Sequence, residues 1–225
     1  MIVLAIDCSA SLCASCVWDT GAGVELGREV RDLGKGHAEH LMAIIDSALE
    51  RAGKTFGEVG AVAVSVGPGS FTGIRVGVST ARGLALALKV AAIGVTTLEA
   101  LAAEASQQFP DRRVLAVLDG GRGEIHAALY DRDLHPLFGP AATTLEEASR
   151  LAGETSAVLA GTAAGSVADA AGAALDIAAP KPTADIAVYA RLAARKGAGE
   201  KPRPLYLRDA DARPQAGFVL PRTAS

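Results

Sequence analysis

Residues 59–88 constrain the fold more than any other stretch of this chain. The segment begins VGAVAVSV, a run of small, apolar and β-branched residues that is typical of a strand buried on both faces. The run stops at Gly67-Pro68-Gly69. Ser70 or Thr72 can then cap a helix that meets no proline before Leu88. A strand, a glycine turn and a helix in this order predict an α/β fold, and the arrangement presents backbone amides to an anion.

The two common nucleotide motifs both fail in this turn. A Walker loop needs Gly-Lys-Ser or Gly-Lys-Thr, whereas Gly73 is followed by Ile74 and Arg75. A dinucleotide fingerprint needs a third glycine where this chain has Thr72. The turn therefore predicts the fold class but does not predict a nucleotide-binding site.

The helix after the turn carries a stripe of small residues at three- and four-residue spacings: Gly73, Gly77, Thr80, Ala81 and Leu84. Each glycine in a helix interior costs roughly 1 kcal/mol relative to alanine, so a close approach by something else must offset that cost. Two interpretations stay open at this point. The stripe faces either the chain's own sheet or helix, or another subunit.

Composition limits the classes of partner. The chain has 225 residues, enough for one domain or two small ones, and its net charge of −3 gives no general attraction to nucleic acid or to an anionic membrane. The initial run MIVLAID has no basic segment before it and stops at Asp7, which indicates a strand rather than a signal peptide. No uncharged window of membrane-spanning length follows. We expect a soluble, cytoplasmic protein whose three cysteines are small buried side chains, with Cys13 and Cys16 on opposite faces of a strand.

The order of expected elements repeats. Residues 2–6, 11–18 and 24–31 are expected strands, followed by a helix from His37, the strand and helix of 59–88, a strand at 90–95 and a helix from Thr97. Beyond Pro110 come strands at 114–119, 124–130 and 134–138, a helix at 145–151 capped by Thr143 and Glu146, a strand at 157–160, an alanine-rich helix, a strand near 174–178 and a helix at 185–196. This predicts two small domains, 1–106 and 107–225. A duplicated βββαβαβα unit is the architecture of the actin, hexokinase and Hsp70-like (ASKHA) superfamily.

That architecture directs attention to two hairpins, which hold metal and phosphate in the ATPases of the superfamily. The first contains Asp7 but has Ser9 where a glycine is usual, and the second contains Asp119-Gly120-Gly121, which a tight turn alone explains. His37 and His40 are three residues apart, so we interpret them as a solvated helix end rather than a metal site. His126 and His135 are interpreted as structural. The sequence thus predicts no catalytic, cofactor-binding or metal-binding residue.

The last 41 residues, from Asp185 onward, hold eight Lys or Arg against four Asp or Glu. Such a segment could touch a phosphate backbone, although a solvated tail is the commoner explanation.

Several segments together resemble the TsaB (YeaZ) family of bacterial tRNA threonylcarbamoyladenosine biosynthesis. They cover nearly the whole chain: GHAEHL at 36–41, GPGSFTGIRVG at 67–77, ARGLA at 81–85, TLEALA at 97–102, the LD-x-x-RGE hairpin at 118–124, and PLYLR followed by Asp211 to Gln215. The resemblance implies a non-catalytic scaffold that binds a TsaD-like catalytic subunit and, through the complex, a TsaE-like ATPase and tRNA. It also implies no cofactor, although a nucleotide at a subunit boundary and a homodimer through the same helices stay open.

On this interpretation the first two helices form the partner surface. The resemblance assigns Gly73, Gly77, Thr80, Ala81, Leu84 and His40 to the interface, and Gly67, Pro68 and Gly69 to the loop that shapes it. Gly77→Trp is then expected to block association while leaving the fold intact. The alternatives are a small ATP-dependent phosphotransferase of the same fold, whose activity would require Asp7, and a self-associating module or peptidase.

Overall fold

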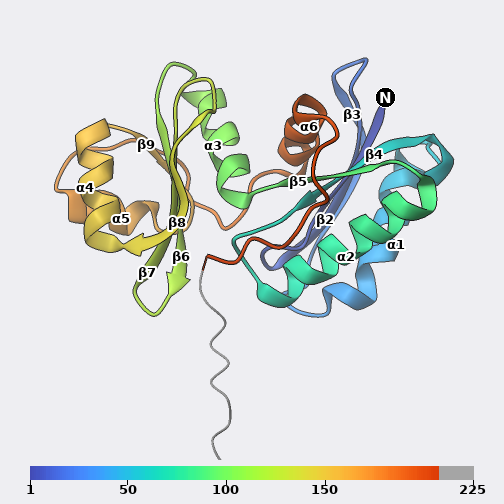
Figure 1. Cartoon of the computed structure of the whole chain (residues 1–225), viewed down its shortest axis with the longest axis horizontal. Helices are drawn as coiled ribbons and strands as arrows, with labels where there is room; N and C mark the ends of the chain where they lie inside the picture. Colours follow the sequence, from blue (N-terminus) through green and yellow to red (C-terminus); the bar gives the residue numbers. More distant parts are fainter. Residues whose placement is uncertain (208–225) are drawn as a thin grey trace, which may run out of the picture.

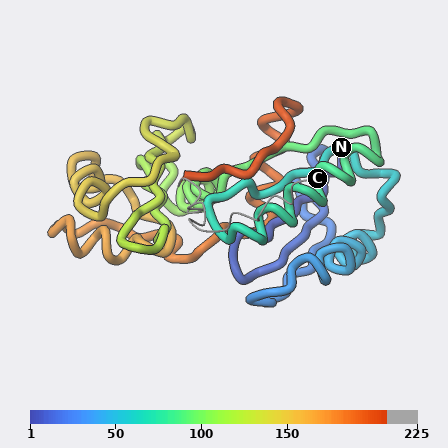
Figure 2. Tube along the Cα trace, turned by 60° about the horizontal axis from the view of Figure 1, so that its bottom comes forward, coloured from blue at the N-terminus to red at the C-terminus, as the bar shows by residue number. Residues whose placement is uncertain are grey.

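The computed structural model describes residues 1–207. The Asp211 to Gln215 motif and the end of the basic segment lie outside the described residues. The chain forms two five-stranded sheets that lie side by side along the long axis of the molecule (Figure 1, Figure 2).

Both sheets have the same topology. The first has the order β3 (Val24–Asp32), β2 (Leu12–Asp19), β1 (Ile2–Asp7), β4 (Val59–Ser65), β5 (Ala91–Val95). The second has the order β8 (Pro136–Thr144), β7 (Glu124–Tyr130), β6 (Val114–Gly121), β9 (Val158–Ala160), β10 (Ile177–Ala179). In each sheet three antiparallel strands are followed by two parallel ones. The predicted ASKHA-like duplication is therefore confirmed.

The helices form three layers around these sheets. α1 (His37–Arg51) and α2 (Phe71–Leu88) cover the outer face of the first sheet. Between α1 and β4 the chain forms a short 3-10 helix (Phe56–Glu58). α4 (Leu145–Thr155) and α5 (Ala164–Ala171) cover the outer face of the second sheet. α3 (Thr97–Gln108) and α6 (Ile186–Lys196) lie between the two sheets (Figure 1).

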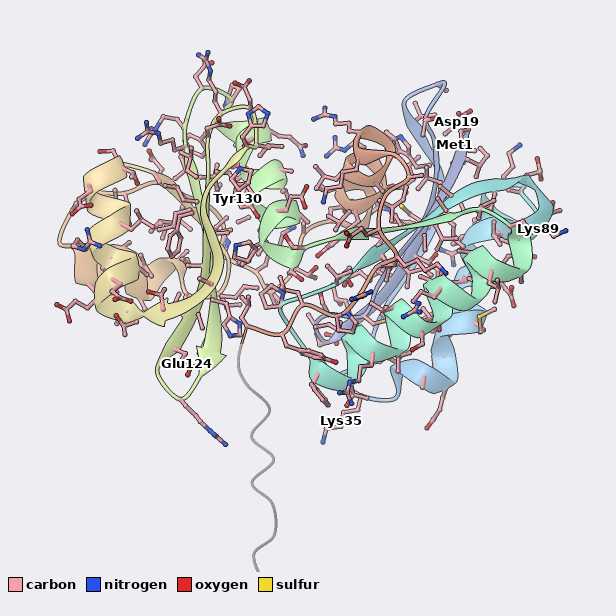
Figure 3. All side chains as sticks on the ribbon, in the orientation of Figure 1. Met1, Asp19, Lys35, Lys89, Glu124 and Tyr130 are labelled. Carbon is pink, nitrogen blue, oxygen red and sulfur yellow. The ribbon has the colours of Figure 1, made fainter. Side chains whose placement is uncertain are left out.

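The central layer exchanges helices between the two halves of the sequence. α3 precedes the second sheet in the chain and packs on β6, whereas α6 follows the second sheet and packs on β1 and β2. One continuous apolar core joins them. It includes Val3 and Ala5 of β1, Leu98 of α3, Val114 of β6 and Tyr189 of α6. Tyr130, at the end of β7, belongs to the same core and lies beside α3 (Figure 3). The division into domains at residue 106 stays a proposal. α3, from the first half of the sequence, packs on the second sheet, and α6, from the second half, packs on the first sheet.

Three expected boundaries shift. The helix of 145–151 is capped by Thr144, whose hydroxyl accepts from the Glu147 amide, one residue later than the Thr143 and Glu146 pair. The strand expected at 134–138 runs from Pro136 to Thr144, because its second part continues to pair with β7 as far as Glu124. The weak strand near 174–178 is β10, where Ile177 pairs with β9.

The cysteines lie as their alternation predicts. Cys13 belongs to the core under α1 and α2, and Cys16 belongs to the central core on the other face of β2. Cys8 is also buried, with its Sγ 3.8 Å from that of Cys13. Within residues 1–207, no helix is both long enough and apolar enough to cross a membrane.

Candidate functional site

Helix α2 begins directly above the turn between β1 and β2. The Ser70 amide donates to the Ser9 carbonyl at 2.7 Å, and the Ser70 hydroxyl accepts from the Gly73 amide at 3.2 Å as the helix N-cap. A Cβ at Gly69 would lie 2.2 Å from the Ser9 oxygen, and one at Gly73 would lie 1.9 Å from the Cys8 oxygen. Only glycine permits this backbone-to-backbone contact at both positions.

This geometry decides between the two interpretations of the small-residue stripe. Gly73, Gly77 and Ala81 are buried against the chain's own first sheet, and a Cβ at Gly77 would touch Val64 and Cys8 at 3.5 and 3.7 Å. Their small size therefore serves packing within the chain. That they also contact a partner is untested and stays a prediction.

The other three residues assigned to the interface differ in exposure. Thr80 and Leu84 are half-buried on α2, and His40 is exposed on α1. Their contact with a partner stays a proposal. His37, interpreted as part of a solvated helix end, is instead buried, and its Nε2 lies 3.3 Å from the Leu12 carbonyl oxygen. It therefore belongs to the packing of α1 on β2.

The loop Gly67, Pro68 and Gly69 is fixed from two sides. The Gly67 carbonyl accepts from the Thr97 amide at 2.8 Å, which ties the loop to the start of α3. Next to it, the Val66 carbonyl accepts from the Leu205 amide at 2.7 Å, so the C-terminal segment also returns to this loop. Gly67 has φ +99°, a conformation that favours glycine. That this loop shapes a partner interface stays a prediction.

Asp7, the residue that could hold a metal in an ATPase of this fold, is enclosed by the chain itself. Only 1% of Asp7 is exposed. Its Oδ1 accepts from the Ser9 amide at 2.9 Å, and its Oδ2 accepts from the Thr183 hydroxyl at 2.6 Å. The Tyr189 hydroxyl lies 2.7 Å from the same Thr183 oxygen and can donate to it. Both carboxylate oxygens thus have partners within the protein.

The Tyr189 phenol keeps its proton in this arrangement. Complete burial raises its pKa well above the ordinary value, and the nearby Asp7 charge raises the pKa further. A neutral phenol donates to Thr183, which leaves the Thr183 proton for Asp7. Sequence reasoning missed both residues, because Thr183 is 176 positions away from Asp7 and no local pattern marks it.

The tips of the two hairpins face a shared cleft of about 540 Å³. Ser9 and Gly69 line it from the first half, and Asp119, His126 and Thr162 from the second. The Asp119 carboxylate accepts from the Gly121 amide at 2.7 Å, and its own amide donates to Thr162 Oγ1 at 3.0 Å. These contacts fit the interpretation of Asp119-Gly120-Gly121 as a turn. Lys35 and Glu124 mark the two sides of this end of the molecule in Figure 3.

Apolar and aromatic side chains are exposed on the outer helices. Phe71 and Leu86 of α2 are 55% and 81% exposed, and Met42 of α1 is 44% exposed. The Arg75 guanidinium lies 3.7 Å from the Phe71 ring centroid, and its Nε donates to the Tyr206 hydroxyl at 2.7 Å. The sequence pointed to the buried side of α2 and missed these residues. The departure of Phe71 and Leu86 from the apolar period was the available signal.

Comparison with known proteins gives concordant similarities. A family model described as "TsaD: tRNA N6-adenosine threonylcarbamoyltransferase" matches residues 31–213. The tRNA threonylcarbamoyladenosine biosynthesis protein TsaB of Escherichia coli is 34% identical over 133 residues, which are 59% of this chain and 56% of that protein. The TsaB protein of Buchnera aphidicola subsp. Schizaphis graminum is 31% identical over 132 residues, 59% of this chain and 61% of that protein. The matched region thus spans less than two thirds of these curated relatives.

A solved structure matches over a longer range. YeaZ from Pseudomonas aeruginosa superposes with a TM-score of 0.73 at 27% sequence identity, covering 92% of this chain and 99% of that one.

Proposed function

This chain belongs to the TsaD family, described as tRNA N6-adenosine threonylcarbamoyltransferase, among its TsaB (YeaZ) members, and from that premise we propose that it is a non-catalytic subunit in the biosynthesis of threonylcarbamoyladenosine in tRNA. Its proposed role is to bind a TsaD-like catalytic subunit. A TsaE-like ATPase and tRNA would meet it through that complex.

The enclosure of Asp7 carries the non-catalytic part of the proposal. A metal ion at this aspartate needs an accessible carboxylate oxygen, whereas both oxygens here accept hydrogen bonds from the protein and the residue is buried. Ser9 stands where a glycine would let a phosphate approach, and its Cβ would lie 3.0 Å from a Cβ placed at Gly69. The residues present therefore do not fit a metal-bound phosphate at this hairpin, which disfavours the phosphotransferase alternative.

The exposed side of α1 and α2 supports the binding part. A contiguous group of exposed apolar side chains on a folded protein is typical of a contact surface. Leu86, near the C-terminal end of α2, is 81% exposed, and Phe71, at the N-terminal end of the same helix, is 55% exposed. We place the partner on this outer side, which includes His40, rather than on the buried glycine stripe.

The test is co-purification with the TsaD-like protein of the same organism, with Leu86→Asp as the variant. A charge at a desolvated contact should reduce recovery of the partner at least about tenfold, equivalent to roughly 1.4 kcal/mol of binding free energy. Leu137→Asp is the matched control, because Leu137 is an exposed leucine on β8 of the other sheet.

Two outcomes would contradict the proposal. Equal partner recovery by Leu86→Asp and the unchanged chain would remove this side of α2 from the interface. Nucleotide turnover or tRNA modification by the chain alone would show that it is itself catalytic.

A further inference from the structure

A second cleft lies between α3 and α6, bordered by the turn that joins β7 to β8. Its volume is about 350 Å³, near the lower end of the sizes that small-ligand sites have. The floor is apolar and includes Leu134, Val188 and Leu192. In Figure 1 the two helices stand side by side in the middle layer of the molecule, so the cleft has walls from both halves of the sequence.

The charges around this cleft are unbalanced. Three arginines line it, Arg132 on the β7–β8 turn and Arg191 and Arg195 on α6, against a single carboxylate, Asp133. The local charge is therefore 3 − 1 = +2 in a chain whose net charge is −3. Asp133 Oδ2 lies 3.6 Å from Arg132 Nε. This ion pair uses the one carboxylate that lines the cleft, so the charges of the two α6 arginines are not neutralised there.

The two α6 arginines are the unusual feature. They are one helical turn apart, a spacing at which like charges repel. Within residues 1–207 neither has an ion-pair partner, although Arg191 lies 5.9 Å from the Trp18 ring centroid. The neighbouring Lys196 contrasts with them, since it pairs with Glu99 at 2.6 Å. The helix dipole stabilises cations in the last turn of α6, which contains Arg195 and Lys196, but its effect does not extend to Arg191.

We propose that this α3/α6 cleft binds a phosphate group, held by the guanidinium groups of Arg191 and Arg195 with Arg132 at the rim. Guanidinium groups donate paired hydrogen bonds that match the geometry of phosphate oxygens. The phosphate belongs either to a small phosphorylated molecule or to an RNA backbone, and the RNA source rests on the proposed function. The cleft is separate from the hairpin cleft and from the exposed side of α2.

Titration of the full-length protein at low salt tests both sources. One arm measures pyrophosphate binding by calorimetry, and the other measures binding of fluorescently labelled tRNA by anisotropy. Arg195→Ala should weaken whichever probe binds by about tenfold or more, as expected for losing one hydrogen bond to a charged group. Arg82→Ala is the matched control, because Arg82 is an exposed helical arginine on α2 without an ion-pair partner in the described part of the chain.

The outcomes separate the sources. Pyrophosphate binding that depends on Arg195 identifies a small phosphorylated ligand. Binding of tRNA but not of pyrophosphate identifies the RNA backbone. In that case the slope of log K against log salt concentration should be smaller by about 1 in Arg195→Ala, because one phosphate contact is lost. If neither probe binds, or if Arg82→Ala weakens binding equally, the proposal is overturned. Recovery of the TsaD-like partner should be unchanged in Arg195→Ala, so a failure here is distinct from a failure of the proposed function.

Discussion

At Gly73 the backbone of α2 comes closer to the β1–β2 turn than any side chain permits. Gly77, one turn later on the same side of the helix, has ordinary van der Waals space around it. Two glycines on one helical stripe therefore have different structural roles. The first allows a backbone contact with Cys8, and the second leaves room that a methyl group would fill.

Alanine substitution should separate these roles. Gly73→Ala is expected to lower the free energy of unfolding by about 2 kcal/mol or more, because its Cβ would overlap the Cys8 carbonyl oxygen. Gly77→Ala is expected to be neutral or stabilising by up to about 1 kcal/mol, because alanine favours the helix. Urea unfolding followed by circular dichroism measures both. Equal effects at the two positions would contradict this account.

The same reasoning changes the expectation for Gly77→Trp. An indole has no room between α2 and the residues Val64 and Cys8. That variant would displace the helix from its own sheet, so loss of partner binding would report misfolding rather than an interface. Leu86→Asp avoids this ambiguity because its side chain is in solvent.

Among the secondary-structure elements, the start of α6 is held to the first sheet by an ion pair. Asp185 is the N-cap, accepting from the Ala187 amide at 2.9 Å, and it pairs with Arg28 of β3 at 2.8 Å. Arg28 also pairs with Glu25. Burial alone would raise the pKa of Asp185, but the hydrogen bonds from Arg28 and the Ala187 amide outweigh it and hold the pKa below the ordinary value.

This shift predicts an acid-dependent contribution to stability. The folded-state pKa of Asp185 is below its unfolded value, so the charged group stabilises the fold above the unfolded pKa, and the contribution disappears as pH falls through the folded pKa. The difference in melting temperature between the unchanged chain and Asp185→Asn should be constant above about pH 5 and vanish in stronger acid. Asparagine retains the cap, so the comparison isolates the charge. A difference that persists unchanged at pH 2 would refute the assignment.

Element order could be predicted from the sequence because each strand and helix has its own apolar period and turn residues. The duplication followed from that order. The direction of the α2 stripe could not be predicted, because small residues at helical spacing suit a sheet and a second subunit equally well. Thr183 escaped notice for a different reason, since its partner Asp7 belongs to the opposite end of the chain. The exposed Leu86 and Phe71 were readable as interruptions of the apolar period.

Across the whole molecule, the hydrogen bonds from Tyr189 through Thr183 to Asp7 link the start of α6 to β1, the first strand. Thr183→Val would keep the shape of the side chain and remove the hydroxyl. We expect the free energy of unfolding to fall by about 2 kcal/mol, because a buried carboxylate oxygen and a buried phenol both lose a partner. Thr183→Ser should retain most of the stability. Denaturant titration compares the three proteins, and a valine variant as stable as the unchanged chain would show that the link contributes nothing.

α3 and α6 each pack on the sheet formed by the other half of the sequence. The two lobes are therefore joined by a shared core and not by a flexible hinge. Spreading them to admit a large ligand at the hairpin tips would uncover the core that both lobes share. A domain movement that other two-lobed proteins make at little cost would here require partial unfolding. Such rigidity would suit the proposed role, in which the chain offers a constant surface to another polypeptide.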